Sequence, residues 1–537
     1  MAGPQSVLAP FENVHLQSRG RTYDLERRGN EYWITMSVSQ ADRESQAGGK
    51  SLPADRPPRA TTKKVVLTTG SHIAQTYWIS SGKGLLQVPW MYHLEEQRWI
   101  PDEDSFLLPP DSPSVTHQWN TNCVKCHTSA PRPGMTKESG FRTQVAELGI
   151  ACEACHGPGE AHVRFREDLK SQPAASVPNL DQDPITNPAR TSPSLASQIC
   201  AQCHSSHREA DLGDWLANGS RFRPGEELEK KVRMHRHNTP ETKADYEQGY
   251  WADGTCRTGG DEYLGLTTSK CFEGGKLSCL SCHSMHRFAS TTDQLRPQMD
   301  GNQACLQCHE DMRDKLQEHT HHAAQSSGSL CMNCHMPHIT YALFKGIRSH
   351  RIDSPSAAVS AMTGRPAACN LCHLDKPLGW TADKLTEWYG QPAVELTDQQ
   401  TTTSATVTMA LQGDAAQRVI AAWHLGWEPA RQASREDWQA PFLAYLLDDP
   451  YSVVRYVSYR SLKKLPGYEE FLYDFVITKE RREQGKNQAL RIWQTRTHPA
   501  FGELGNSILM NQEGQLDIEA AEEILKKRDN RRIAIPE

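Results

Sequence analysis

The sequence predicts a multidomain α+β protein with three regions. These are a β-rich N-terminal module at residues 1–114, a mostly α and irregular middle domain at 115–375, and an all-α C-terminal domain at 376–537. Three observations predict this division. Residues 18–110 contain runs of alternating apolar and polar residues, as half-buried strands do. The middle region repeats the pentapeptide Cys-x-x-Cys-His, and beyond residue 376 apolar residues recur with a helical period.

The N-terminal module begins with a predicted hairpin. The stretch RTYDLERRGNEYWITMSV alternates around a Gly29-Asn30 turn. The runs KKVVLTTG, QTYWIS and LLQVPWMYHL are rich in β-branched and aromatic residues, which predicts further strands. Between them, SQADRESQAGGKSLPADRPPRATT is predicted to be a polar linker.

Seven copies of Cys-x-x-Cys-His lie in the middle domain, and their repetition indicates covalent haem attachment. In c-type attachment both thiols bond to the porphyrin and the adjacent histidine binds the iron, so that histidine has one fixed position. A zinc ribbon, the main alternative, requires no such adjacency. The predicted sites for seven haem c groups are Cys123, Cys126 and His127; Cys152, Cys155 and His156; Cys200, Cys203 and His204; Cys279, Cys282 and His283; Cys305, Cys308 and His309; Cys331, Cys334 and His335; and Cys369, Cys372 and His373.

Two of the sixteen cysteines, Cys256 and Cys271, lie outside these motifs. We expect a disulfide between them, because haem is attached in an oxidising compartment and the DGTCRTGGDEY loop is rich in glycine. Two unrelated buried thiols are the alternative.

The composition also fits a haem-organised middle domain. Mean hydropathy is −0.66 and only 37% of the 537 residues are hydrophobic, which is low for several aliphatic cores. Porphyrin surface can replace aliphatic side chains, so we expect the middle domain not to fold without haem. The net charge of −6 argues against a nucleic-acid partner. No stretch approaches the roughly 18 apolar residues of a transmembrane span.

Haem attachment predicts an exported protein of the periplasm or cell surface. However, the N-terminal sequence MAGPQSVLAPFENVHLQ lacks the basic and apolar regions of a signal peptide. We therefore expect either a processed chain or a start site that lies further upstream.

The C-terminal domain contains two similar helical stretches, GDAAQRVIAAWHLGW and DDPYSVVRYVSYRSLKKL. Each is predicted to begin at an Asp cap, with Pro450 at the first helical position after Asp449 in the second. Arg418 and Arg455 lie about 37 residues apart, near the period of HEAT-like repeats. A plain helical bundle is the alternative. His424 and His498 are expected to be ordinary helix residues.

Sixteen further histidines could bind the second axial position of each iron, which favours bis-His over Met/His ligation. Three motifs extend to CHxxH, and we expect that second imidazole to bind a neighbouring haem. In CEACHGPGEAHV a Gly-Pro-Gly turn precedes another candidate, His162. The EHTHHAA segment supplies one of His319, His321 or His322. The predicted distal candidates are His162, His207, His286, His338, His350, His117, His72, His321 and His322. Weaker candidates are His235 and His237, whereas His15 and His93 are expected at the surface or in the β module.

The segments CEACHGPGEAHV, GKLSCLSCHSMH and SLCMNCHMPHITY resemble multihaem cytochromes c with doubled CxxCH motifs. This family is related to the tetrahaem carrier of ammonia oxidation and to octahaem oxidoreductases, and the resemblance spans roughly residues 65–375. It implies an exported, mostly bis-His haem chain that moves electrons. Many relatives carry a further CxxCH upstream of a segment like SVLAPF, which implies an eighth haem upstream of Met1, with His72 as its first candidate ligand.

The predicted function is electron transfer between redox partner proteins, among them a quinol-oxidising membrane complex or other cytochromes. The main alternative is an oxidoreductase that acts on a small nitrogen or sulfur compound at one haem with an open distal site. The chain has no CxxCK motif, which removes the lysine-ligated class of nitrite-reducing haems. A scaffold whose helical repeats recruit a redox complex is a third possibility.

Overall fold

The computed structural model describes residues 1–38, 60–112, 117–138, 140–171, 182–240, 248–341 and 344–535. The predicted polar linker lies almost entirely outside these ranges. The chain divides into two compact units. The first comprises Met1–Glu103, Pro113–Pro188 and Glu209–Glu226, and the second comprises Asp104–Ser112, Ala189–Arg208 and Glu227–Glu537. The mixed α+β class is confirmed, whereas the division into three domains stays a prediction.

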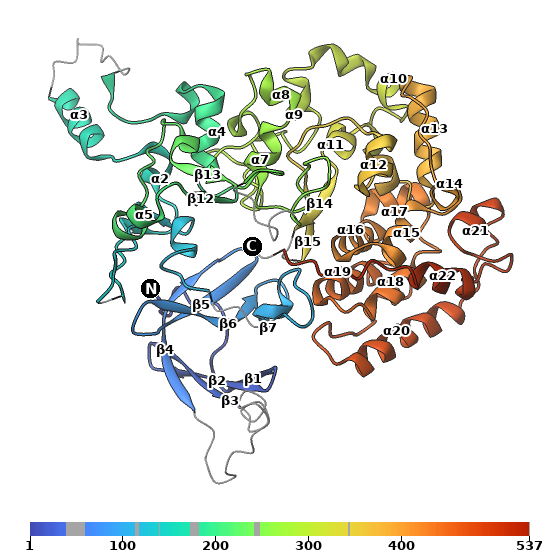
Figure 1. Cartoon of the computed structure of the whole chain (residues 1–537), viewed down its shortest axis with the longest axis horizontal. Coiled ribbons are helices and arrows are strands. Elements are labelled where there is room, and N and C mark those ends of the chain that lie inside the picture. The colour runs from blue at the N-terminus through green and yellow to red at the C-terminus, as the bar shows by residue number, and fades with distance from the viewer. Residues whose placement is uncertain are drawn as a thin grey trace, which may run out of the picture. The chain divides into compact units, whose positions relative to one another are not determined.

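The first unit contains the predicted β module, a seven-stranded antiparallel sheet in which each strand pairs with the next along the chain (Figure 1). Its strands are β1 (Val14–Ser18), β2 (Arg21–Arg28), β3 (Glu31–Val38), β4 (Thr61–Thr69), β5 (Ala74–Ser80), β6 (Leu85–His93) and β7 (Arg98–Pro101). The predicted hairpin joins β2 to β3, and Gly29 takes a φ of +62° in its turn. A residue without Cβ adopts this left-handed conformation at little cost.

The two faces of the sheet carry different cores. On one face, Phe11 packs edge-on against Tyr32, Tyr77 and Trp99, with ring centroids 5.1, 5.4 and 5.5 Å apart. The next residue of β5, Trp78, belongs to a second cluster with Leu67, Trp119, Val124 and Trp215. Successive strand residues point to opposite faces, so this second cluster packs against the other side of the sheet. Val124 lies inside the first CxxCH motif, which is therefore anchored to the sheet.

The rest of the first unit consists of short elements around the first two motifs. They are η2 (Cys123–Lys125), β8 (Thr128–Ser129), β9 (Met135–Thr136), β10 (Gly140–Phe141), β11 (Glu147–Leu148), α2 (Cys152–His156), α3 (Glu160–Lys170) and α5 (Leu212–Asn218). Two antiparallel pairs, β8 with β11 and β9 with β10, close the loops between the motifs.

The second unit contains the other five motifs on short helices and turns. Its elements up to the last motif include α4 (Pro193–Ala201), β13 (Val232–Met234), α7 (Glu262–Thr267), α8 (Lys270–Glu273), η6 (Cys279–Ser281), α9 (Gln303–Leu306), α10 (Leu316–Thr320), α11 (Cys331–His335), β14 (His338–Tyr341), β15 (Lys345–Arg348), α12 (Ala357–Thr363) and η9 (Ala368–Leu371). The strand β12 (His207–Glu209) lies at the boundary between the two residue ranges.

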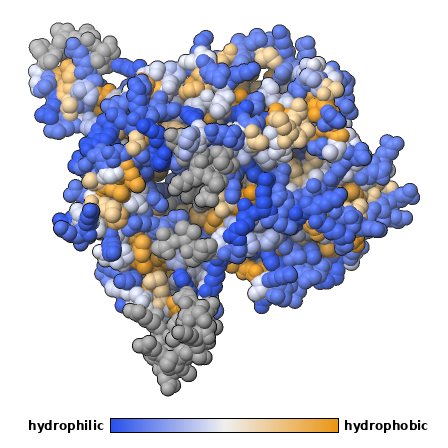
Figure 2. Space-filling view, in the orientation of Figure 1, coloured by the Kyte–Doolittle hydropathy of each residue, from blue (hydrophilic) through white to orange (hydrophobic). Residues whose placement is uncertain are grey.

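Helices make up the remainder of the second unit (Figure 1). They are α13 (Leu378–Tyr389), α14 (Asp398–Thr402), α15 (Ala405–Gln412), α16 (Ala415–Leu425), α17 (Glu428–Ser434), α18 (Ala440–Leu447), α19 (Ser452–Leu462), α20 (Lys479–Gln494), α21 (Glu503–Ser507) and α22 (Ile518–Leu525). Helix α16 packs on α15 and α19, and α18 packs on α19 and α20. Apolar residues such as Val419 and Leu443 are fully buried, while the visible surface over α20 is mostly hydrophilic (Figure 2). The predicted helical region is confirmed, and its HEAT-like character stays a prediction.

One of the two predicted Asp caps is wrong. Asp414 caps α16 as predicted, because its Oδ1 accepts hydrogen bonds from the backbone N–H of Ala416 and Gln417, both at 3.1 Å. The second helix begins two residues later than expected, at Ser452, so Pro450 lies outside it. The carboxylate of Asp449 instead binds the guanidinium of Arg418 at 2.6 and 3.1 Å.

Two buried ion clusters connect distant parts of the second unit. Arg257 binds both carboxylate oxygens of Asp414 at 2.6 and 2.7 Å, and its guanidinium lies 4.1 Å from the ring centroid of Trp251. Asp449 binds Arg418 and, at 3.2 Å, Arg528. Both carboxylates have no exposed side-chain surface. The first cluster joins the loop at Arg257 to α16.

Within the described ranges, the helices are all too short or too polar to cross a membrane.

Candidate haem-binding sites

Every CxxCH motif forms a single helical or 3₁₀ turn, which explains why the chemistry needs this spacing. In five motifs, the backbone N–H of the histidine donates to the carbonyl of the first cysteine at 2.8–3.0 Å, as in His283 to Cys279. The other two motifs form α2 and α11. Positions i, i+3 and i+4 lie on one face of such a turn. The two thiols and the imidazole therefore point to the same side, as one porphyrin requires.

Three proximal histidines each face a second histidine. The ring centroids of His283 and His350 are 6.3 Å apart, those of His335 and His319 are 6.2 Å apart, and those of His373 and His322 are 5.9 Å apart. Two imidazoles that bind opposite sides of one metal ion, each at about 2 Å from its nitrogen, place their centroids about 6 Å apart. The spacing of all three pairs thus fits an iron between them.

Hydrogen bonds prepare these imidazoles for metal binding. A carbonyl oxygen only accepts, so a histidine Nδ1 beside one must carry the proton, and this leaves Nε2 as a lone-pair donor. The acceptors at 2.6–3.2 Å are the carbonyls of Asp293 for His283, Asp353 for His335, Thr320 for His322, Arg348 for His350 and Thr186 for His156. This pattern orients the rings in both units.

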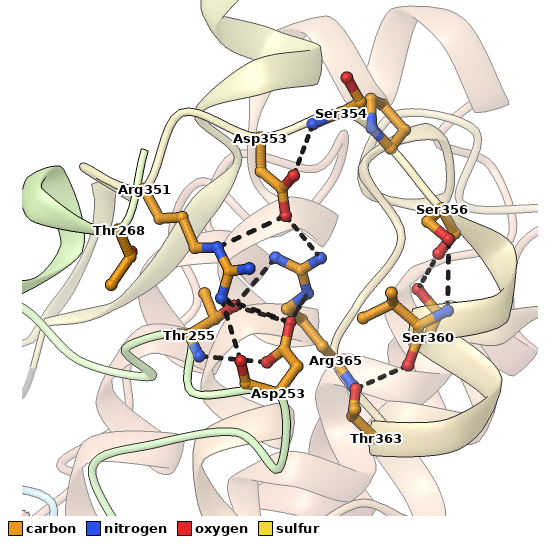
Figure 3. A network of polar contacts seen from close by, with 12 residues as sticks. Asp253, Thr255, Thr268, Arg351, Asp353, Ser354, Ser356, Ser360, Thr363 and Arg365 are labelled. Atoms are coloured by element: carbon orange, nitrogen blue, oxygen red, sulfur yellow. Dashed lines mark hydrogen bonds and ion pairs between the residues drawn. The ribbon is translucent and has the colours of Figure 1, made fainter. Parts of the chain in front are cut away.

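A polar network supports the carbonyl that orients His335 (Figure 3). The Asp353 carboxylate accepts from Ser354 N–H at 2.9 Å and lies 3.2 Å from Arg365 and 3.6 Å from Arg351. Both arginines also lie near Asp253, at 3.5 and 3.8 Å. The segment that positions the sixth motif's histidine is thereby tied to a distant loop of the same unit.

Consecutive motifs in the second unit lie next to each other. A hydrogen bond with Cys200 lowers the pKa of Cys279, and a hydrogen bond with Cys305 lowers the pKa of Cys331. Burial and then the charge of Cys334 raise the pKa of Cys369 to about 12. These contacts place the third motif beside the fourth, the fifth beside the sixth, and the sixth beside the seventh.

The structure also locates the predicted distal histidines of the first unit. His162 donates from Nδ1 to Asp183 at 2.6 Å, a carboxylate that also binds Arg166 at 2.7 Å. The ring of His117 lies 3.8 Å from Asp102, and burial lowers its pKa. His72 is exposed beside Ser71, whose hydroxyl lies 3.3 Å from Nδ1. Their roles as ligands stay predictions.

In the second unit, the CHxxH histidines have different surroundings. His207 donates from Nδ1 to the Ser205 carbonyl at 3.0 Å, while His286 is exposed. His338 is largely buried beside His424, with ring centroids 5.1 Å apart, and burial strongly lowers its pKa. These three assignments also stay predictions. His321 stacks on Trp388 with ring centroids 4.2 Å apart and belongs to none of the three pairs.

Sequence reasoning undervalued His424. It lies on α16 as expected, but its Nδ1 donates at 2.6 Å to the carbonyl of Leu371, inside the seventh motif. Its Nε2 is buried without a hydrogen-bond partner in the described part of the chain, and burial lowers the pKa to about 3. Glu262, which accepts from His204 Nδ1 at 3.2 Å, was likewise missed. Neither residue lies near a CxxCH motif in the sequence, so no local signal could identify them.

The expected disulfide is not formed. Cys256 and Cys271 are both free thiols, the first buried and the second partly buried. Cys256 Sγ lies 3.9 Å from the carbonyl of Asp261, and Cys271 lies on α8 near Cys305. The two cysteines thus face different neighbours despite the glycine-rich loop between them.

A match to one family model supports the haem interpretation of two of the motifs. The family model described as "Doubled CXXCH motif" matches residues 270–314, which contain the fourth and fifth motifs. No curated protein matches the sequence significantly. Among solved structures, the chain is similar to the "Outer Cell Wall Cytochrome OcwA", at 14% identity and a TM-score of 0.38, over 79% of this chain and 86% of that one.

Proposed function

We propose that this chain is a multihaem c-type cytochrome that passes electrons along seven closely spaced, mostly bis-His haems. The observation that carries the proposal is the set of three opposed imidazole pairs, His283 with His350, His335 with His319 and His373 with His322. Each pair combines a proximal histidine of one motif with a histidine from elsewhere in the same unit. With haem bound, the two histidines of each pair would both bind the iron and leave no open position for a substrate, which suits a carrier better than an enzyme.

When bound, haem c supplies reversible one-electron chemistry at iron. The chain's own residues set the conditions for it. Carbonyl acceptors such as Asp353 O fix the orientation of the imidazoles and raise their basicity as ligands. Cys331 lies beside Cys305, and α11 contacts η9, so neighbouring motifs lie close together. Electrons would thus pass between adjacent motifs within the second unit.

The setting proposed for this activity is the periplasm or the cell surface, because covalent haem attachment takes place outside the cytoplasm. The proposed partners are redox proteins, among them a quinol-oxidising membrane complex or other cytochromes. The net charge of −6 favours partners that present basic patches.

Two measurements on the purified holoprotein test the proposal. We expect pyridine haemochrome quantitation to give seven haems per chain, and electron paramagnetic resonance of the oxidised protein to show mostly low-spin iron. A protein with bound zinc and no haem would contradict the central claim. One fully high-spin haem among low-spin haems would instead favour the oxidoreductase alternative, because a substrate needs an open distal position.

Replacing His350 with alanine should convert one haem from low spin to high spin while all seven haems stay attached. The substitution removes one axial imidazole but leaves the thioether bonds and the proximal His283 in place. Resonance spectra recorded beside a haemochrome assay measure both quantities. The matched control is His498→Ala, since that ring stacks on Trp493 in the helical region and should leave the spectrum unchanged. An unaltered low-spin signal in His350→Ala would remove His350 from the ligand set.

A further inference from the structure

A four-residue stretch at the end of α10 faces two haem motifs at once. His319 faces His335 of the sixth motif, with the two rings nearly parallel at 8°. Three residues later, His322 faces His373 of the seventh motif. If the proposed function holds, residues 319–322 therefore supply the distal ligands of two neighbouring haems.

A continuous helix could not do this. Residues i and i+3 of an α-helix lie on the same face, so both rings would point toward one motif. Helix α10 instead ends at Thr320, and His321 adopts a left-handed φ of +56°. This conformation redirects the chain between the two ligands. It is unfavourable for a residue with a Cβ, so it needs support from outside the turn.

The last turn of α13 provides that support. Trp388 stacks on His321 at a centroid distance of 4.2 Å and an interplanar angle of 14°. Tyr389 packs edge-on against His319 at 5.8 Å and against His321 at 5.9 Å, and its hydroxyl donates to the His319 carbonyl. Two consecutive aromatic residues thus contact both the imidazole rings and the backbone of the turn.

We propose that Trp388 and Tyr389 form an aromatic clamp that holds the His319–His322 turn so that two irons receive their distal ligands together. The clamp residues are positioning residues, because they contact the turn and its imidazoles rather than reacting atoms. The inference rests on the proposed function and adds a specific consequence to it. Loosening one aromatic contact should disturb two haems, not one.

The test uses Trp388→Ala in the full-length holoprotein. We expect the haemochrome count to stay at the wild-type value while the low-spin resonance signal falls by the equivalent of two haems and a high-spin signal rises to match. Trp388→Phe keeps a flat ring and should retain the wild-type spectrum. The control is Trp33→Ala, which removes another partly buried tryptophan with a cation over its ring. Arg28 lies 4.8 Å from the Trp33 ring centroid, and Lys384 lies 5.4 Å from that of Trp388.

The possible outcomes separate the clamp from the proposed function. An unchanged low-spin signal in Trp388→Ala, or a loss equivalent to a single haem, would overturn the clamp while leaving the haem chain intact. A wild-type protein without covalent haem would instead overturn the proposed function. Should Trp388→Ala fail to fold, Trp388→Leu preserves apolar bulk without a stacking ring, and it should show the same two-haem change.

Discussion

Replacing Asp449 with alanine should lower the free energy of unfolding of the second unit by about 3–5 kcal/mol, because it leaves a buried guanidinium without its counter-charge. Asp449 is fully buried and binds Arg418, whose side chain is 1% exposed. It also accepts from the Tyr451 N–H at 2.9 Å and pairs with Arg528 near the C-terminus. Denaturant unfolding followed by circular dichroism measures the change.

The neighbouring residue offers a matched control. Asp448→Ala removes the same side chain from a partly exposed ion pair with Lys486, at 3.2 Å, and such pairs contribute at most about 1 kcal/mol. A similar loss of stability in both variants would show that Asp449 has no special role.

The same carboxylate predicts a pH dependence. Burial alone would raise the pKa of Asp449, but the charges of Arg418 and Arg528 outweigh burial and hold the pKa below its ordinary range. Because the pKa of Asp449 is lower in the folded than in the unfolded protein, its ionisation stabilises the fold. This stabilisation is complete above the unfolded pKa of about 3.9 and is lost as the pH falls through the folded pKa. The difference in stability between wild type and Asp449→Ala should therefore shrink in strong acid.

The double substitution Cys331→Ser and Cys334→Ser should remove one of the seven proposed haems and interrupt the series of neighbouring haems in the second unit. The sixth motif lies between the fifth, through Cys305, and the seventh, through Cys369. Without its thioether bonds the haem of this motif has no covalent attachment. Haemochrome quantitation should give six haems, and stopped-flow reduction should separate into two phases.

Cys271→Ser is the control for this experiment. It makes the same chemical change at a partly buried thiol outside the motifs, so the count should remain seven. A double variant that still carries seven haems would show that the sixth motif does not attach one.

Local sequence signals predicted the local structure well. The Gly29-Asn30 hairpin and the Asp414 cap both follow from interactions within a few residues. The CxxCH turns are of the same kind, because thiols and imidazole are placed by one helical turn. The second cap at Asp449 was wrong because Arg418, distant in the sequence, competes for the carboxylate.

The opposed histidines could not be predicted in the same way. The CHxxH pattern favoured His207, His286 and His338 as distal ligands, and these assignments stay predictions. The three pairs in the structure use His350 and His322, which were also predicted candidates, and His319. These rings meet their partners through tertiary packing. His319 was named only among three alternatives, since nothing in EHTHHAA shows which ring a left-handed turn would redirect.

The residues that join the helical region to the rest of the second unit are synthesised in a definite order. A chain is synthesised from its N-terminus, and His424 follows its acceptor Leu371 by 53 residues, while Asp414 follows Arg257 by 157 residues. All seven CxxCH motifs therefore leave the ribosome before α16, the helix that contacts the seventh motif and the loop at Arg257. If the chain is exported in the same N-to-C order, the thiols of Cys369 and Cys372 reach the compartment of haem attachment before the helical region can fold against them.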